Sequence, residues 1–100
     1  MMPLSIDRKP QAKRDAIEIW DYIAPNGPRA AEGMLRRIDK AIKMLAERPE
    51  GGRACEELGT GIRSFPVESY RVFYRYSANT LTIVRILHAA RDITPDLLAE

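Results

Sequence analysis

The stretch that decides the fold reads YRVFYRY (70–76), SANT (77–80) and LTIVRILH (81–88). In the first run alternate residues share a face, as they do in a β-strand. The second run is rich in the β-branched and aliphatic side chains that pack well in strands. The residues between the runs include Asn79, which tolerates the positive φ of a tight turn. The stretch therefore predicts a β-hairpin.

A two-residue loop at Ala78 and Asn79 sets the register of this hairpin. It places four pairs opposite each other: Tyr76 and Leu81, Tyr74 and Ile83, Val72 and Arg85, Tyr70 and Leu87. That face is apolar except for Arg85, which we expect to be paired because an unpaired buried charge is costly. A slip of one residue would exchange the faces of one strand.

The opposite face of the hairpin combines apolar and basic side chains. We expect Phe73, Val84 and Ile86 to form an exposed apolar strip there. The strip is rimmed by Arg71 and Arg75, and His88 is on the same face. An exposed apolar strip of this kind is typical of a binding surface.

Composition limits the class of protein. One hundred residues are enough for one core, so we expect a single domain over residues 1–100. The lone Cys55 cannot form an internal disulfide, which fits a reducing, cytoplasmic compartment. No apolar run approaches the about 18 residues of a membrane span. Residues 58–91 carry five arginines against one acid, Glu68, and this excess predicts an anionic partner: RNA, an acidic protein segment or a phosphate ligand.

The chain before the hairpin predicts one strand, two helices and another strand. Residues 4–7 alternate as a strand, and residues 11–24 have the apolar spacing of a helix, with Trp20 expected in the core. A tight turn leads to a second helix over 28–47, and residues 53–60 are expected to form a loop. A strand over 61–65 is expected to end at Pro66.

These elements predict an α+β fold in two layers. The order is β-α-α-β-β-β, with an αα-hairpin packed on a small, mainly antiparallel sheet. After the hairpin, Pro95 is expected to start a short turn or helix in which Leu97 and Leu98 dock. The sequence has no metal-ligand cluster and no phosphate-binding glycine loop, so we expect no cofactor.

The layout, together with GIRSFPVESYRVFYRY (61–76) and LTIVRILHAARD (81–92), resembles the ParE branch of the RelE/ParE toxin superfamily. The resemblance covers almost the whole chain and rests on the order and spacing of the motifs. It implies a bacterial toxin of a toxin–antitoxin system. The implied partner is a small ParD-like antitoxin that neutralises the toxin in a hetero-oligomer.

Two activities occur in this superfamily, and the residues help to separate them. RelE-type members cut messenger RNA on the ribosome, and Arg71 and Arg91 match positions where those ribonucleases carry arginines. Their lysines and their terminal tyrosine are missing here, since the last lysine is Lys43 and the last tyrosine is Tyr76. Arginine stays protonated and cannot serve as a general base. His88 is the remaining acid–base candidate.

The leading hypothesis is therefore a non-enzymatic toxin that inhibits DNA gyrase by binding. Its target-binding residues would be Arg71, Arg75, His88 and Arg91, and its antitoxin-binding residues would be Phe73, Val84 and Ile86. The first alternative is a RelE-like ribosome-dependent ribonuclease that uses Arg71, Arg91 and His88. The second is an antitoxin-binding module with little toxicity.

Overall fold

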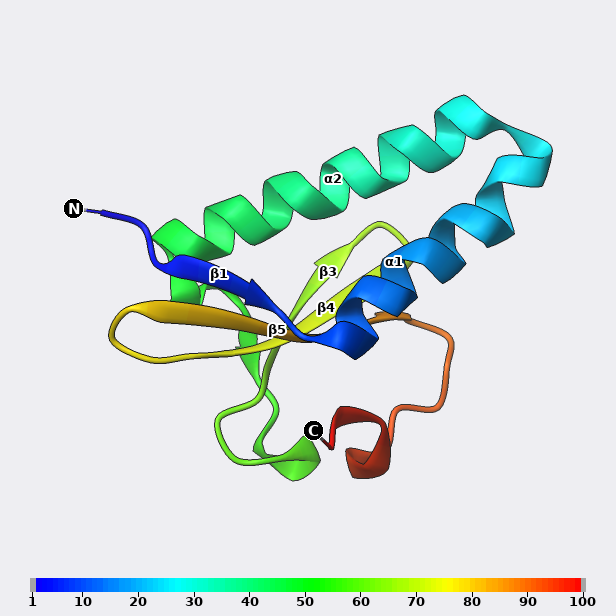
Figure 1. The fold of residues 1–100 in the computed structure, drawn as a ribbon. Coiled ribbons are helices and arrows are strands. Elements are labelled where there is room, and N and C mark those ends of the chain that lie inside the picture. Colours follow the sequence, from blue (N-terminus) through cyan, green and yellow to red (C-terminus); the bar gives the residue numbers. More distant parts are fainter. Residues whose placement is uncertain (1, 100) are drawn as a thin grey trace.

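Two helices cover one face of a five-stranded sheet in the computed structural model, which describes residues 2–99 (Figure 1). The main elements are β1 (Ser5–Arg8), α1 (Pro10–Ile23), α2 (Pro28–Glu47), β2 (Arg53–Ala54), β3 (Arg63–Val67), β4 (Tyr70–Tyr76) and β5 (Thr80–His88). The strand order is β1-β5-β4-β3-β2, with β1 parallel to β5 and the other pairs antiparallel. The predicted α+β fold is confirmed.

Short 3-10 turns connect these elements. They are η1 (Ala24–Asn26), η2 (Pro49–Gly51), η3 (Glu56–Leu58) and η4 (Pro95–Leu98). In Figure 1, η3 and η4 lie on the side of the sheet away from the helices. Residues 53–60, expected to be a loop, thus include the short edge strand β2 and η3. Arg53 and Ala54 pair with β3, and their polar, exposed setting hides the strand from a pattern search.

Each long helix begins with a proline at its first position, where the missing N–H costs nothing. The predicted bounds of α2 are confirmed, and its buried stripe includes Ala31, Ile38 and Ile42. Trp20 was expected in the core, but the residue is 36% exposed. Ile19 points into the core instead, and the next residue is about 100° further round the helix. Within residues 2–99, neither helix has the length and apolarity to cross a membrane.

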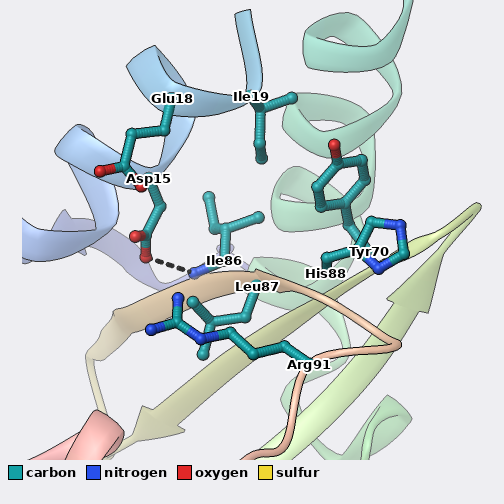
Figure 2. Close-up of a pocket in the computed structure, with 8 residues that line it drawn as sticks. All are labelled: Asp15, Glu18, Ile19, Tyr70, Ile86, Leu87, His88 and Arg91. Atoms are coloured by element: carbon teal, nitrogen blue, oxygen red, sulfur yellow. Dashed lines mark hydrogen bonds between the residues drawn. The ribbon is translucent and has the colours of Figure 1, made fainter. Parts of the chain in front are cut away.

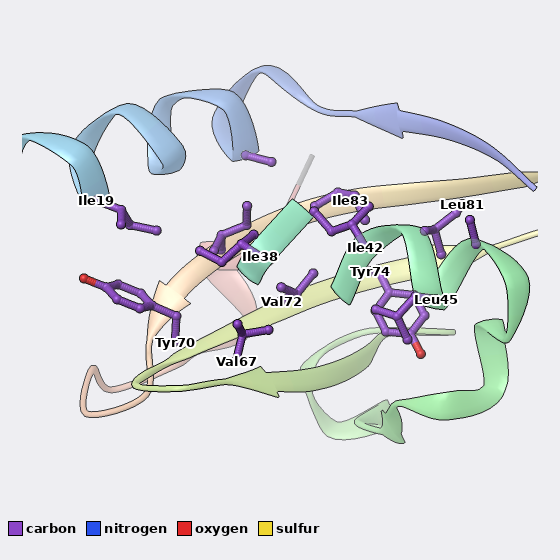
Figure 3. Packing of buried hydrophobic residues seen from close by; sticks show 13 residues of the cluster. Ile19, Ile38, Ile42, Leu45, Val67, Tyr70, Val72, Tyr74, Leu81 and Ile83 are labelled. Atoms are coloured by element: carbon purple, nitrogen blue, oxygen red, sulfur yellow. The ribbon is translucent and has the colours of Figure 1, made fainter. Parts of the chain in front are cut away.

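The main core fills the space between the helices and the sheet (Figure 3). Side chains of Ile19, Ile38, Ile42 and Leu45 meet strand residues that include Val67, Tyr70, Val72, Tyr74, Leu81, Ile83 and Ile86. Burying such side chains contributes about 1.5–3 kcal/mol each relative to exposure. This layer fixes the ends of β4 and β5 against α1.

A second cluster lies on the other face of the sheet. It contains Cys55, Ile62, Phe73, Val84, Leu87 and Leu98. The docking of Leu98 confirms the predicted C-terminal turn. The expectation of an exposed apolar strip is wrong, because Phe73, Val84 and Ile86 are 0%, 2% and 2% exposed. The first two are covered by this cluster, and Ile86 faces the helices.

A β-bulge explains why Ile86 changes face. The pairs Tyr76–Leu81 and Tyr74–Ile83 are confirmed, but the next strand pair is Phe73–Arg85. Val84 is thus the extra residue, and every later partner moves by one position. The predicted pairs Val72–Arg85 and Tyr70–Leu87 are wrong: the observed ones are Val72–Ile86 and Tyr70–His88.

Strand β3 continues through Pro66, where a break was expected. Pro66 pairs with Arg71 on β4, and β3 ends only at Val67. Strand β2 pairs with Arg63 and Ser64 alone, so β3 is an edge strand at Pro66 and needs no N–H there. The turn to β4 is made by Glu68, with φ of 54°, and Ser69.

The buried hydroxyl of Tyr74 ties η2 to the sheet. It accepts a hydrogen bond from the Gly52 N–H at 2.8 Å and donates one to the Pro49 carbonyl at 2.6 Å. Burial raises the pKa of Tyr74 above its ordinary value. A Cβ on Gly52 would lie 2.5 Å from this hydroxyl and 2.7 Å from the Ser64 carbonyl oxygen, so only glycine fits there.

Candidate functional site

Tyr70 and His88 meet where the hairpin ends against α1. The two residues are opposite each other in the ladder, and their rings make an edge contact with centroids 5.2 Å apart and planes at 77°. His88 is exposed, and its Nδ1 accepts a hydrogen bond from the Ala90 N–H at 3.0 Å. A neutral imidazole that accepts at Nδ1 carries its proton at Nε2, so His88 offers a donor to a partner.

A cavity of about 140 Å³ separates this ring pair from α1 (Figure 2). We call it the strand-end pocket. Its lining comes from α1, from the ends of β4 and β5 and from the following loop: Asp15, Glu18, Ile19, Tyr70, Ile86, Leu87, His88 and Arg91. Figure 2 shows Arg91 reaching back from the loop after β5. The pocket therefore joins a basic side chain to the only histidine of the chain.

Asp15, which lines the pocket, forms an ion pair with Arg85. Arg85 donates from Nε to Asp15 Oδ2 at 2.8 Å and from Nη2 to Oδ1 at 2.9 Å. The side chains of Arg85 and Asp15 are 13% and 3% exposed, so the predicted pairing of Arg85 is confirmed. The hydrogen bonds to Asp15 raise the pKa of Arg85 above its ordinary value.

Asp15 also completes the hydrogen bonding of β5. Strand β1 pairs with β5 only as far as Ile83, so within residues 2–99 the edge of β5 beyond it has no strand neighbour. The Ile86 N–H donates to Asp15 Oδ2 at 2.9 Å and thus has a side-chain acceptor where a strand would supply a carbonyl. Arg85 extends the network by donating from Nη1 to the Leu97 carbonyl at 2.8 Å, which holds η4.

Arg71 and Arg75 lie on the face of the sheet that carries the second cluster, opposite to the helices. The Arg71 guanidinium is 5.3 Å from the Phe73 ring centroid and donates to Ser64 Oγ at 2.7 Å. Ser64 Oγ is in turn 3.3 Å from the buried Cys55 Sγ. Arg75 lines a separate cavity of about 230 Å³ beside η3 and η4.

The structure thus divides the four predicted target-binding residues between two places. Arg71 and Arg75 share the face with the second cluster, whereas His88 and Arg91 line the strand-end pocket. Among residues 2–99, no group of three His, Cys, Asp or Glu side chains is arranged to hold a metal ion.

Sequence reasoning missed the residues that complete the pocket, namely Asp15, Glu18 and Tyr70. A signal existed for Asp15: it lies on the apolar stripe of α1 between Ala12 and Ile19. An acid on a buried stripe indicates a buried cationic partner, and Arg85 on an apolar strand face was the matching candidate. Glu18 and Tyr70 gave no such signal.

The family model for the ParE toxin of the type II toxin–antitoxin system parDE matches residues 6–93. The chain belongs to this toxin family. It is 37% identical over 90 residues to toxin ParE1 of Mycobacterium tuberculosis, covering 88% of this chain and 92% of that protein. Toxin ParE1 of Caulobacter vibrioides is 35% identical over 93 residues, with 92% and 94% covered. Toxin RelE2 of the same organism is 38% identical over 81 residues, with 81% and 90% covered.

Solved structures have the same fold. A chain of the chromosomal ParDE system from P. aeruginosa matches with a TM-score of 0.72 at 23% identity, covering 85% of this chain and 95% of that one. A chain of the toxin–antitoxin complex RelBE2 from Mycobacterium tuberculosis matches with a TM-score of 0.63 at 24% identity, covering 87% and 99%. ParE and RelE toxins therefore share this arrangement of helices and sheet.

Proposed function

We propose that this ParE-family toxin inhibits DNA gyrase by binding and without catalysis, and that an antitoxin neutralises it in the bacterial cytoplasm. The observation that carries the proposal is the separation of Arg71 from His88 by the sheet. A ribonuclease must bring phosphate-stabilising groups and proton-transfer groups to one scissile bond. Arg71 packs on Phe73 on one face, whereas His88 packs on Tyr70, which belongs to the core on the other face.

Inhibition by binding needs none of this chemistry. Stalling a gyrase–DNA intermediate requires only that the toxin binds that state more tightly than the others. Exposed basic side chains such as Arg91 attract an acidic protein or a DNA-containing complex. The absence of a converged catalytic set among the predicted residues is therefore compatible with toxicity.

A supercoiling assay tests the target. We expect relaxed plasmid to remain unsupercoiled when purified gyrase is given excess chain. Arg91→Ala should weaken inhibition, while Arg29→Ala, an exposed arginine at the start of α2, should not. Removing exposed charges usually costs under about 0.5 kcal/mol, so circular dichroism should show both variants folded. Full supercoiling at excess toxin would remove gyrase as the target.

A ribonuclease is the second candidate, favoured by the similarity to toxin RelE2 and by His88 and Arg91 sharing one pocket. Losing general acid–base partners typically costs about 10²–10⁴-fold in rate, so we expect no cleavage of translated message. Primer extension on messenger RNA from expressing cells is the measurement. Codon-specific cuts that vanish in His88→Ala would show that the chain is a ribonuclease, and the proposal of gyrase inhibition would be withdrawn.

An antitoxin partner is supported by the toxin–antitoxin systems to which the similar folds belong. We expect it to cover apolar side chains that this chain leaves exposed, which include Met2, Ile17 and Tyr22. Co-expression with the neighbouring gene, followed by affinity purification of the tagged toxin, should yield a hetero-oligomer. Recovery of the chain alone would contradict the proposal, and a complex formed by a chain that does not slow growth would identify a module with little toxicity.

A further inference from the structure

The outer face of α2 carries a dense group of cations. Arg36, Arg37, Lys40 and Lys43 lie in the segment RRIDKAIK (36–43), and all four are exposed. We call them the α2 basic cluster. Figure 1 shows α2 along the outside of the molecule, with the sheet and α1 beneath it. Lys40 is about 200° round the helix from the buried Ile38, so the cluster points away from the core.

The cluster brings like charges together at unfavourable positions. Residues three and four apart are neighbours on a helix surface, so Lys40 has Arg36, Arg37 and Lys43 beside it. Like charges at such spacings destabilise a helix. The arrangement therefore does not serve the stability of α2, and an anion placed over Lys40 would relieve the repulsion among all four side chains.

The acids of this part of α2 are already engaged. Glu32 Oε1 accepts from Arg36 Nη2 at 2.9 Å, and Asp39 Oδ1 accepts from Nη2 of Arg8 on β1 at 3.0 Å. Within residues 2–99, the other three members of the cluster have no ion-pair partner. Glu47, one turn beyond the last of them, limits the cluster at that end. The positive charge of this face is thus left for a ligand.

The surroundings of the cluster select the kind of polyanion. None of the large apolar side chains that are exposed within residues 2–99 is on α2, whereas protein interfaces have an apolar centre. The helix also contains no aromatic residue on which the bases of a single strand could stack. Phosphate groups of a duplex need neither feature, because lysine and arginine alone hold them.

We propose that the α2 basic cluster binds the phosphate backbone of duplex DNA without reading its sequence. The cluster extends about 10 Å along the helix, and duplex DNA carries one charge per about 1.7 Å of its axis, so several phosphates lie within reach. The inference deepens the proposed function in one respect: a toxin that stalls a gyrase–DNA intermediate gains affinity from the DNA as well as from the protein.

The test is a titration of a short fluorescent DNA duplex with the chain alone, followed by anisotropy at several salt concentrations. Three or four phosphate contacts predict a slope of about −3 to −4 for log K against log salt. Duplexes of unrelated sequence should bind equally, and the single strand more weakly. A flat salt dependence, tighter binding of the single strand, or displacement by polyglutamate as effective as by DNA would overturn the proposal.

Two variants separate the cluster from general charge attraction. Lys40→Gln should weaken duplex binding about three- to tenfold and reduce the salt slope by about 1. Arg29→Gln removes the same charge from an exposed position of α2 outside the cluster and should change affinity less than about twofold. Equal losses in the two variants would refute the role of the cluster.

The outcome is independent of the gyrase assay, because no gyrase is present in the titration. Gyrase inhibition by a chain that does not bind the duplex would refute this inference and leave the proposed function. Duplex binding that Lys40→Gln weakens, by a chain that leaves supercoiling intact, would do the reverse. Circular dichroism should show both glutamine variants folded, since they change exposed side chains only.

Discussion

Replacing Asp15 by alanine should be among the most damaging single changes to this fold. It removes both hydrogen bonds to Arg85 and the acceptor of the Ile86 N–H. Breaking a buried ion pair from one side costs about 3–5 kcal/mol, because the other charge stays buried and unpaired. A domain of this size is stable by about 5–15 kcal/mol, so the variant should lose a large part of its stability.

Urea denaturation followed by circular dichroism measures this loss, and a double-mutant cycle apportions it. Arg85→Met removes the unpaired charge, so Asp15→Ala with Arg85→Met should lose less than the sum of the single changes. Glu32→Ala is the matched control. It breaks an exposed pair with Arg36 at 2.9 Å, for which about 0.5 kcal/mol is expected. A loss under about 1 kcal/mol for Asp15→Ala, or additive losses in the cycle, would refute the reasoning, since exposed pairs behave in that way.

Three further changes test the packing around the sheet. Gly52→Ala should cost at least about 1–3 kcal/mol in thermal denaturation, through overpacking against the Tyr74 hydroxyl, whereas Gly33→Ala inside α2 should stabilise by up to about 1 kcal/mol. The pKa of Tyr74 is raised above 10.0, so its neutral form stabilises the fold below pH 10 and that contribution is lost as pH rises through the folded-state pKa. Above pH 10 the free energy of unfolding in urea should accordingly fall less steeply for Tyr74→Phe than for the parent chain. An equally steep fall in both would contradict the stabilising role of the neutral phenol. Leu98→Ala should cost about 2–5 kcal/mol by opening a cavity over Phe73, and a two-state urea curve close to the parent would show that η4 is dispensable.

Local patterns predicted the elements of this fold well, because helix and strand periodicity is written in neighbouring residues. The two helices, the hairpin loop and the first pairs of its register follow from spacing and turn chemistry alone. The bulge at Val84 does not, since both possible faces of β5 offer apolar side chains and the choice depends on α1. The position of Ile86 is fixed by the hydrogen bond of its N–H to Asp15, 71 residues away.

The candidate site was harder to predict for the same reason. His88 and Arg91 are three residues apart, so their common location could be anticipated from sequence. Their separation from Arg71 depends on which face of β4 meets the helices, and the bulge alters that geometry in β5. Phe73 is buried in a cluster that includes Leu98, a residue of a distant 3-10 turn, and no sequence pattern links the two.

The hydrogen bond between Asp15 and the edge of β5 also bears on how the protein is made. The acceptor and its Arg85 partner are 70 positions apart, so α1 must wait for the last strand before the buried pair can form. At about 5–20 residues per second, the ribosome takes about 4–14 s to add that interval. During this time the nascent chain lacks the contact that completes the hydrogen bonding of β5. The buried pair between the first helix and the last strand is thus among the latest contacts of the fold to form during synthesis.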